Sequence, residues 1–174
     1  MPLEEDLVLK AAHGDRSAFE AVIGPMLDQA HRLAVGLLDN TDEAEDAVQE
    51  ATVKAWRKLH RLRTGAKLRP WFLAIVSNQC REMRRSRWRT VLPLLGARAV
   101  TTADQDTDQH VDVIHALARL RPRDREAIVL HYYLDLPMSE VASVTHSSVA
   151  ATKSRIYRAL KTMKPALESM EALR

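Results

Sequence analysis

Residues 70–89, PWFLAIVSNQCREMRRSRWR, change from an apolar segment to a basic one. The second half carries five guanidinium groups, on Arg81, Arg84, Arg85, Arg87 and Arg89, against the single carboxylate of Glu82. Guanidinium groups bind phosphates and other anions, and the amide of Asn78 can both donate and accept a hydrogen bond. The segment therefore predicts contact with an anionic ligand such as nucleic acid. The alternative is a core helix whose basic end is merely solvated.

A second basic cluster lies in residues 138–164, MSEVASVTHSSVAATKSRIYRALKTMK. The pattern predicts two helices separated by three or four residues, with Ser147 or Ser148 capping the second, which is a helix-turn-helix arrangement. The second helix carries Lys153, Arg155, Arg158, Lys161 and Lys164. One face of it should present Lys153, Ser154, Tyr157 and Arg158. Such a face suits DNA, and a helical hairpin without DNA binding is the alternative.

A third charged segment begins near Asn40, which stands at capping-box spacing from Glu43. Acidic residues fill its first half and basic residues its end: Asp42, Glu43, Glu45, Asp46 and Glu50, then Lys54, Arg57, Lys58, Arg61 and Arg63. The expected buried stripe is Ala44, Ala47, Val48, Ala51, Ala55, Trp56 and Leu59. The acidic side, with Gln49, is then open to a basic or polar partner. Solvation matched to the helix dipole is the alternative, and a metal site is disfavoured because no His or Gly-rich loop accompanies the carboxylates.

Composition narrows the class of protein. The chain has 174 residues, of which 46% are hydrophobic and 28% charged, with five glycines, so one helical domain or two small ones are expected. The sequence contains no apolar run long enough to span a membrane and its start, MPLEEDLVLK, lacks a basic signal region, which predicts a cytoplasmic protein. The single cysteine, Cys80, permits no internal disulfide, and we expect no metal and no cofactor. Phosphate-loop and nucleophile motifs are missing, which argues against an all-helical enzyme.

Helical elements must position these clusters. We expect a short helix over residues 4–13, a second capped by Ser17 with Glu20 and interrupted at Gly24-Pro25, and a basic helix starting at about Pro70. The apolar side of the basic helix is expected to comprise Trp71, Phe72, Ile75, Val76, Cys80 and Met83. In the C-terminal part, Pro122 should begin a helix whose apolar side is Ile128, Val129, Tyr132 and Tyr133.

The stretch between the clusters is a linker by composition. It is acidic through Asp104, Asp106, Asp108 and Asp112, and residues 99–118 contain no Lys or Arg. The prediction is an all-α chain of two small helical domains, residues 1–89 and 112–174, joined by an acidic, flexible linker at residues 90–111.

Together the motifs resemble those of the extracytoplasmic-function (ECF) sigma factors, group 4 of the sigma-70 superfamily of bacterial RNA polymerase. DEAEDAVQEATVKAWRKLHRLR is similar to the region 2 helix that binds polymerase, and LRPWFLAIVSNQCREMRR to the segment that melts the minus-ten element. LRPRDREAIVLHYYLDLPMSEVA with SSVAATKSRIYRAL is similar to region 4, which reads the minus-thirty-five element. The resemblance covers both halves of the chain in the family's order.

The resemblance implies a non-catalytic initiation factor. The partners it implies are core RNA polymerase, through the clamp of the beta-prime subunit and the beta flap, promoter DNA, and an anti-sigma factor. It places polymerase binding on Asp42, Glu45, Asp46, Gln49, Glu50 and Trp56. It places DNA binding on Trp71, Asn78, Arg81, Arg84, Arg85, Ser148, Lys153, Ser154, Arg155, Tyr157 and Arg158. Asn78 falls at the position that lines a pocket for a flipped base.

Three residues of the helix-turn-helix depart from the family pattern. His146 stands where Gly is usual in the turn, and Thr145 and Thr152 replace apolar residues. His tolerates positive φ better than most residues, but two hydroxyls in the hairpin core are expected to weaken it. The competing function is a helix-turn-helix transcriptional regulator whose N-terminal helices sense a ligand or dimerise; a second basic helix at residues 70–89 would be unnecessary in such a protein.

Overall fold

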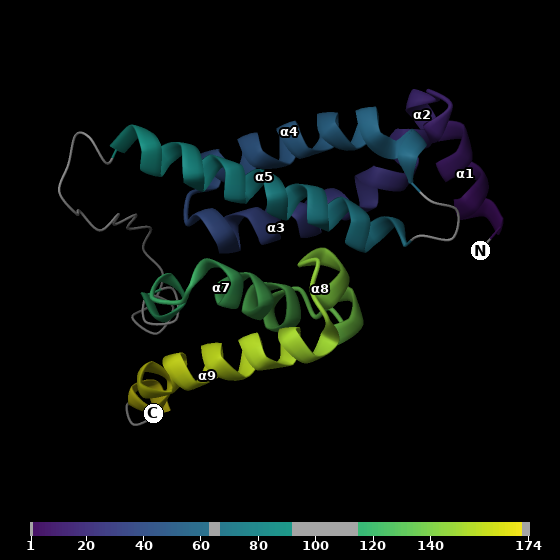
Figure 1. Cartoon of the computed structure of the whole chain (residues 1–174). Coiled ribbons are helices and arrows are strands. Elements are labelled where there is room, and N and C mark those ends of the chain that lie inside the picture. The colour runs from purple at the N-terminus through teal and green to yellow at the C-terminus, as the bar shows by residue number, and fades with distance from the viewer. Residues whose placement is uncertain (1, 63–66, 92–114, 172–174) are drawn as a thin grey trace. The chain divides into compact units, whose positions relative to one another are not determined.

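The computed structural model describes residues 2–62, 67–91 and 115–171, and every regular element among them is helical (Figure 1). The chain divides into two units, residues 1–96 and 97–174. The prediction of an all-α chain with two helical domains is confirmed. The predicted linker lies outside the described residues, except that the last helix of the first unit extends to Val91.

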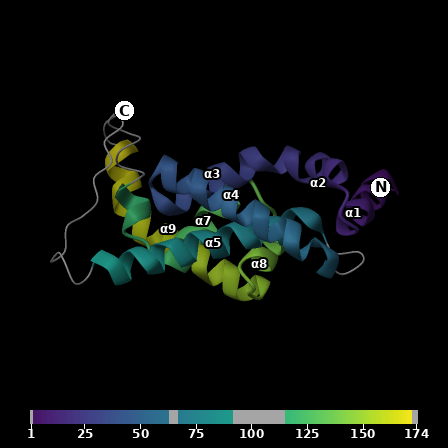
Figure 2. The same ribbon diagram turned by 90° about the horizontal axis from the view of Figure 1, so that it is seen from above.

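The first unit is built on three long helices, α3 (Leu27–Leu38), α4 (Thr41–Lys58) and α5 (Leu68–Val91). They lie side by side in both views (Figures 1 and 2) and pack on one another. α1 (Pro2–Ala12) and α2 (Arg16–Ile23) lie at one end of this bundle, where α1 packs on α2 and on the short turn η2 (Leu59–Arg61). A 3-10 turn, η1 (Gly24–Met26), separates α2 from α3, which confirms the interruption expected at Gly24-Pro25.

Close approach of these helices depends on small residues. α4 buries four alanines, Ala44, Ala47, Ala51 and Ala55, each without exposed surface. Their spacing of three or four residues places them on one side of α4. Larger side chains of the neighbouring helices, such as Leu33 of α3 and Phe72 of α5, fill the space that the alanines leave. The opposite side of α4 is consequently left for solvent or a partner.

Side-chain caps fix where two of these helices begin. The Asn40 side chain accepts a hydrogen bond from the Glu43 amide at 2.8 Å, as predicted. The second helix is capped differently from expectation, because Asp15 accepts from the Ala18 amide at 2.9 Å. Ser17 lies inside α2, so the predicted Ser17 cap is wrong. Both acceptors bind an amide three residues ahead, which is the geometry of an N-cap.

The buried side of α5 is wider than predicted. Phe72, Val76 and Cys80 are buried as expected, but Trp71, Ile75 and Met83 are only half-buried. Leu73, Ala74, Ser77 and Gln79 complete the core face, and Leu68 and Pro70 are buried where the helix begins. The reason is that α5 packs against both α3 and α4, so two neighbouring faces are covered.

The second unit contains α7 (Pro122–Ile128), a π-helical turn η3 (Val129–Tyr133), α8 (Met138–Val144) and α9 (Val149–Glu171). α7 and α8 both pack on α9. Pro122 opens α7 and Ser148 caps α9, accepting from the Ala151 amide at 3.1 Å, as the sequence predicts. Residues 115–118 form a short helical turn before α7.

The π-helical turn overturns one prediction. Tyr132 and Tyr133 were expected on the apolar side of their helix, but they are 59% and 50% exposed. The Leu134 amide bonds to the Val129 carbonyl five residues back, at 3.0 Å. This wider turn rotates the following residues relative to α-helical spacing. Leu130 and Leu134 take the core positions instead.

None of the described helices combines the length and apolar composition needed to cross a membrane. In the same residues, no group of three or more His, Cys, Asp or Glu side chains is arranged to hold a metal ion.

Candidate functional site

The outward side of α4 combines carboxylates with apolar surface. The side chains predicted for polymerase binding, Asp42, Glu45, Asp46, Gln49 and Glu50, are all exposed. Val53 is 45% and Trp56 37% exposed. We call these seven residues the α4 face. Val53 was missed in the sequence, although its position four residues after Gln49 places it on the same side of the helix.

Trp56 does not belong to the buried stripe predicted for it. Its ring meets the buried ring of Phe19 edge-on, with 5.0 Å between centroids and planes at 80°. This edge-to-face contact with α2 fixes the indole at the margin of the core. The rest of the ring can bury further surface against a partner.

Lys54 links α4 to α5. Its Nζ donates to Gln79 Oε1 at 2.5 Å and to Glu82 Oε2 at 2.7 Å. The hydrogen bond from Lys54 lowers the pKa of Glu82 below that of an exposed glutamate. This contact joins the helix that carries the α4 face to the basic helix α5.

The arginines of α5 fall into two groups. Arg84 Nη1 donates to the Leu37 carbonyl at 3.2 Å, and Arg87 Nη1 lies 3.3 Å from Glu43 Oε2. These two guanidiniums therefore cover the end of α3 and the start of α4. Arg85 is exposed. The side chain of Arg89, also counted in the basic cluster, lies outside the described residues.

Asn78 is exposed on α5, and its Oδ1 accepts a hydrogen bond from Arg81 Nη2. Arginine can only donate hydrogen bonds, so the atom of the Asn78 amide that faces Arg81 is the oxygen. The amide NH2 of Asn78 is then the end left for a ligand. Ile75 and Trp71 are half-buried one and two turns earlier on the same side of the helix, where they can form an apolar wall.

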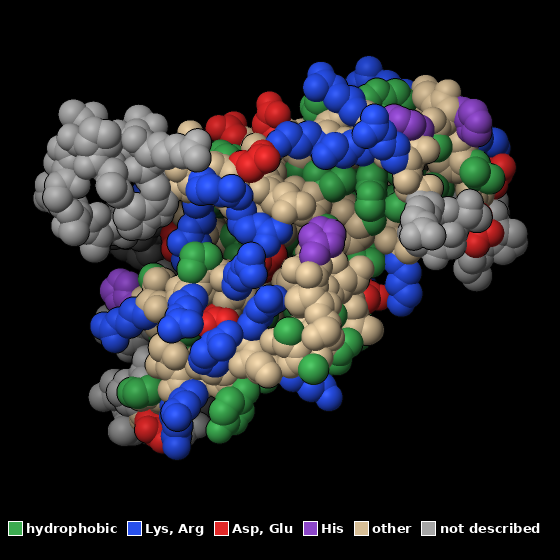
Figure 3. Space-filling model, viewed as in Figure 1, with side chains coloured by type: hydrophobic (Ala, Val, Ile, Leu, Met, Phe, Trp, Pro, Cys, Tyr) green, Lys and Arg blue, Asp and Glu red, His purple; other side chains and the backbone are tan. Residues whose placement is uncertain are grey.

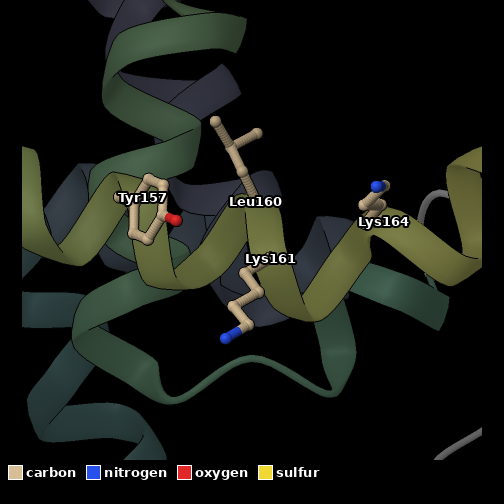
Figure 4. A pocket seen from close by; sticks show the side chains of 4 residues that line it. All are labelled: Tyr157, Leu160, Lys161 and Lys164. Carbon is tan, nitrogen blue, oxygen red and sulfur yellow. The ribbon is translucent and has the colours of Figure 1, made fainter.

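α9 carries five cationic side chains, Lys153, Arg155, Arg158, Lys161 and Lys164, and Figure 3 shows Lys and Arg spread along it. Lys153, Ser154, Tyr157 and Arg158 are exposed, with Tyr157 at 72%, whereas Arg155 is half-buried. Further along, Tyr157, Leu160, Lys161 and Lys164 line an open depression of about 520 Å³ (Figure 4). Ser148, also predicted to bind DNA, is exposed but uses its hydroxyl as the cap of α9. The face predicted from Lys153, Ser154, Tyr157 and Arg158 is thus exposed, and its role in DNA binding stays a prediction.

Arg158 is tied to α7. Its Nε donates to Asp124 Oδ2 at 3.0 Å and its Nη2 to Asp124 Oδ1 at 2.9 Å. The hydrogen bonds from Arg158 to the carboxylate raise the pKa of the guanidinium further above neutrality. Asp124 was not singled out in the sequence, because a carboxylate at the start of a helix is ordinary there.

The turn between α8 and α9 is closed by hydroxyl groups. Ser147 Oγ lies 2.7 Å from Thr145 Oγ1 and 2.9 Å from Thr152 Oγ1, and Thr145 also donates to the Val141 carbonyl at 2.8 Å. Ser147 donates to Thr145 and Thr145 to Val141, while the one hydrogen of the Thr152 hydroxyl serves either Ser147 Oγ or the Ser148 carbonyl, which lies 3.0 Å away. The buried hydroxyls expected to weaken the hairpin are therefore paired. His146 takes the positive φ of the turn, 49°, as anticipated for a residue standing in place of Gly.

Both units match known protein families. Residues 23–90 match the family model of sigma-70 region 2, and residues 110–163 match that of sigma-70 region 4. The ECF RNA polymerase sigma factor SigM of Mycobacterium tuberculosis is 31% identical over 157 residues, which are 88% of this chain and 80% of SigM.

Two solved structures show the same likeness. Sigma factor RpoE of Bartonella quintana, in complex with the anti-sigma factor NepR, is 27% identical with a TM-score of 0.72 over 86% of this chain and 96% of RpoE. CnrH, in complex with the cytosolic domain of CnrY, is 25% identical with a TM-score of 0.74 over 95% of this chain and 97% of CnrH. The helical units, the two regions in order and these relatives agree: the chain belongs to the ECF sigma factors, which direct RNA polymerase in transcription initiation.

Proposed function

We propose that this sigma factor docks on core RNA polymerase through the α4 face. The observation that carries the proposal is the composition of that face, in which exposed carboxylates surround the part-exposed side chains of Val53 and Trp56. Tryptophan is enriched among the residues that dominate interface energies, and surrounding charges select the partner and speed its approach. The clamp of the beta-prime subunit is the partner surface that the family resemblance indicates.

The basic helix α5 acts on DNA in this proposal. Phosphate neutralisation by Arg81 and Arg85 holds the strand but carries little sequence information. Opening the minus-ten element requires a site that recovers the cost of unstacking a base, about a few kcal/mol. Asn78 supplies the polar contact and Trp71 and Ile75 the apolar wall. Because Arg81 occupies the amide oxygen, Asn78 is expected to donate to an acceptor on the base edge.

The second unit holds upstream DNA. Lys153, Ser154, Tyr157 and Arg158 form the side of α9 that would read the minus-thirty-five element, and Lys161 would meet phosphate. The same unit would contact the beta flap of the polymerase. The protein acts in the cytoplasm and makes no bonds itself, since the polymerase supplies the catalysis.

An anti-sigma factor is the regulator that the relatives suggest. RpoE was solved with the anti-sigma factor NepR bound, and CnrH with the cytosolic domain of CnrY bound. We propose that a comparable protein binds this chain and competes with the polymerase for it.

The docking proposal is tested by reversing charge on the α4 face. Asp46→Lys with Glu50→Lys should weaken binding to core RNA polymerase at least about tenfold, since like charges opposed across an interface cost several kcal/mol. Glu5→Lys with Asp28→Lys makes the same charge change at exposed positions outside the α4 face and should leave the affinity unchanged. Far-UV circular dichroism should show all variants folded, because solvent-facing charges contribute little to folding. Equal affinity of the two double variants would overturn the assignment.

A further inference from the structure

Among Lys153, Ser154, Tyr157 and Arg158, which form the proposed reading face of α9, Arg158 forms an ion pair with a residue of another helix. Both oxygens of Asp124 on α7 are engaged by its guanidinium, at 2.9 and 3.0 Å. The Asp124 side chain is 6% exposed, whereas that of Arg158 is 51% exposed. A buried carboxylate therefore holds one edge of a guanidinium whose remainder faces solvent.

The geometry of the contact determines which donors remain. A guanidinium carries five N–H groups in one plane. Asp124 takes the edge formed by Nε and Nη2. The edge formed by Nη1 and the second N–H of Nη2 is left, and it presents two parallel donors. Guanine offers two matching acceptors, O6 and N7, in the major groove.

The contact with Asp124 also preorganises the Arg158 side chain. An exposed arginine samples many rotamers, and ordering it on binding opposes affinity. The two hydrogen bonds to Asp124 restrict those rotamers before DNA arrives. Asp124 can do this because its own side chain is packed in the domain and has little freedom to move.

We infer that Asp124 is a positioning residue for promoter recognition, which aims the free edge of the Arg158 guanidinium at a guanine of the upstream element. The inference rests on the proposed role of α9 in reading that element. It extends the reading site to α7, which makes no DNA contact in the proposal. Loss of the carboxylate should then lower sequence discrimination rather than DNA binding in general.

The test uses holoenzyme assembled from core RNA polymerase and the full chain. Upstream elements are first selected from a random DNA library by the wild-type holoenzyme. Affinity is then measured for the selected promoter and for copies in which each guanine of the element is replaced in turn by 7-deazaguanine, which lacks the N7 acceptor. The discrimination ratio is the affinity for the intact promoter divided by that for the substituted one. A good bidentate contact is worth about 5- to 150-fold against a wrong base, and 7-deazaguanine removes one of its two hydrogen bonds, so the expected ratio is about 2- to 12-fold at one guanine.

Three variants separate positioning from stability. Asp124→Asn keeps the size of the side chain but replaces one of the two acceptor oxygens by an NH2 group, which cannot accept from Arg158. It should bring the discrimination ratio close to that of Arg158→Ala. The double variant should be no worse than Arg158→Ala alone, because Asp124 acts through Arg158. Asp124→Glu retains a carboxylate and should restore part of the ratio, and it also serves if Asp124→Asn does not fold. Lys161→Ala is the control, with equal loss on every DNA and an unchanged ratio.

Each other outcome has a definite meaning. If Asp124→Asn weakens binding to all DNAs equally and keeps the ratio, the contact only fastens α9 to α7 and the inference is wrong. If it strengthens binding to all DNAs, Asp124 withholds Arg158 from DNA, and the inference is again wrong. If Arg158→Ala itself keeps the wild-type ratio, the proposed reading role of Arg158 fails, and this result is distinct from the other two.

Discussion

Arg84 and Arg85 are adjacent in the sequence, yet their side chains have different surroundings. Arg84 donates to the Leu37 carbonyl at the end of α3, whereas Arg85 is exposed. We predict that Arg84→Ala destabilises the first unit and that Arg85→Ala weakens DNA binding. The pair is a matched test, since each substitution removes one guanidinium from the same turn of α5.

The expected size follows from the contact. A hydrogen bond from a charged donor contributes about 1.5–3 kcal/mol, and partial exposure places Arg84→Ala at about 1–2 kcal/mol of unfolding free energy. With a urea slope of about 1–3 kcal/mol/M, the unfolding midpoint should fall by roughly 0.3–2 M. Arg85→Ala should change stability by less than about 0.5 kcal/mol. It should instead reduce the salt dependence of holoenzyme binding to DNA by about 0.9 in log–log slope, as expected for one phosphate contact.

Tryptophan fluorescence makes the stability measurement specific to the first unit. All three tryptophans, Trp56, Trp71 and Trp88, belong to residues 1–96. Urea unfolding followed by this signal therefore reports the unit that contains Arg84. A wild-type midpoint for Arg84→Ala, together with a reduced salt slope, would refute the assignment of Arg84 to the α3 end.

Three further predictions concern the caps and contacts of both units. Asn40→Ala should cost about 1 kcal/mol of unfolding free energy by tryptophan fluorescence, because it removes the cap of α4, and an unchanged midpoint would contradict the cap. Thr152→Val should speed amide hydrogen exchange in α9, because it removes a hydroxyl paired with Ser147 Oγ and the Ser148 carbonyl, at a cost of about 0.5–1.5 kcal/mol; slower exchange would mean that the hydroxyl weakens the core. Lys54 lowers the pKa of Glu82 in the folded state, so the stabilisation is present above the unfolded pKa of about 4.3 and is lost as pH falls through the folded value. Glu82→Gln should flatten that acid loss in urea midpoints measured from pH 6 to pH 3, and an identical pH profile would contradict the contact.

Local sequence signals predicted where helices begin and break, but they did not predict the contacts between helices. Asn40, Pro122 and Ser148 are helix starts that capping chemistry and proline identify without tertiary information. Gly24-Pro25 likewise marked an interruption. The Ser17 cap failed because Asp15, two residues earlier, offers a competing acceptor of the same kind.

The contacts that distinguish individual basic residues depend on tertiary structure. Arg84 lies 47 residues from its acceptor in Leu37, and Arg158 lies 34 residues from Asp124. Nothing in the local pattern separates such residues from arginines that face solvent. The π-helical turn that exposes Tyr132 is also invisible to a periodicity of 3.6 residues.

Promoter opening is the step on which the proposed mechanism depends. A fluorescent base analogue in the minus-ten element of a selected promoter reports unpairing by the holoenzyme. We predict that the wild-type chain with core RNA polymerase gives a fluorescence rise that core alone does not give. Asn78→Ala should bind polymerase and duplex DNA nearly normally but open the element more slowly, and a template already unpaired there should restore much of the lost transcription. Opening at the wild-type rate by Asn78→Ala would contradict the assignment of base capture to α5, and the absence of any rise with the wild-type chain would contradict the mechanism as a whole.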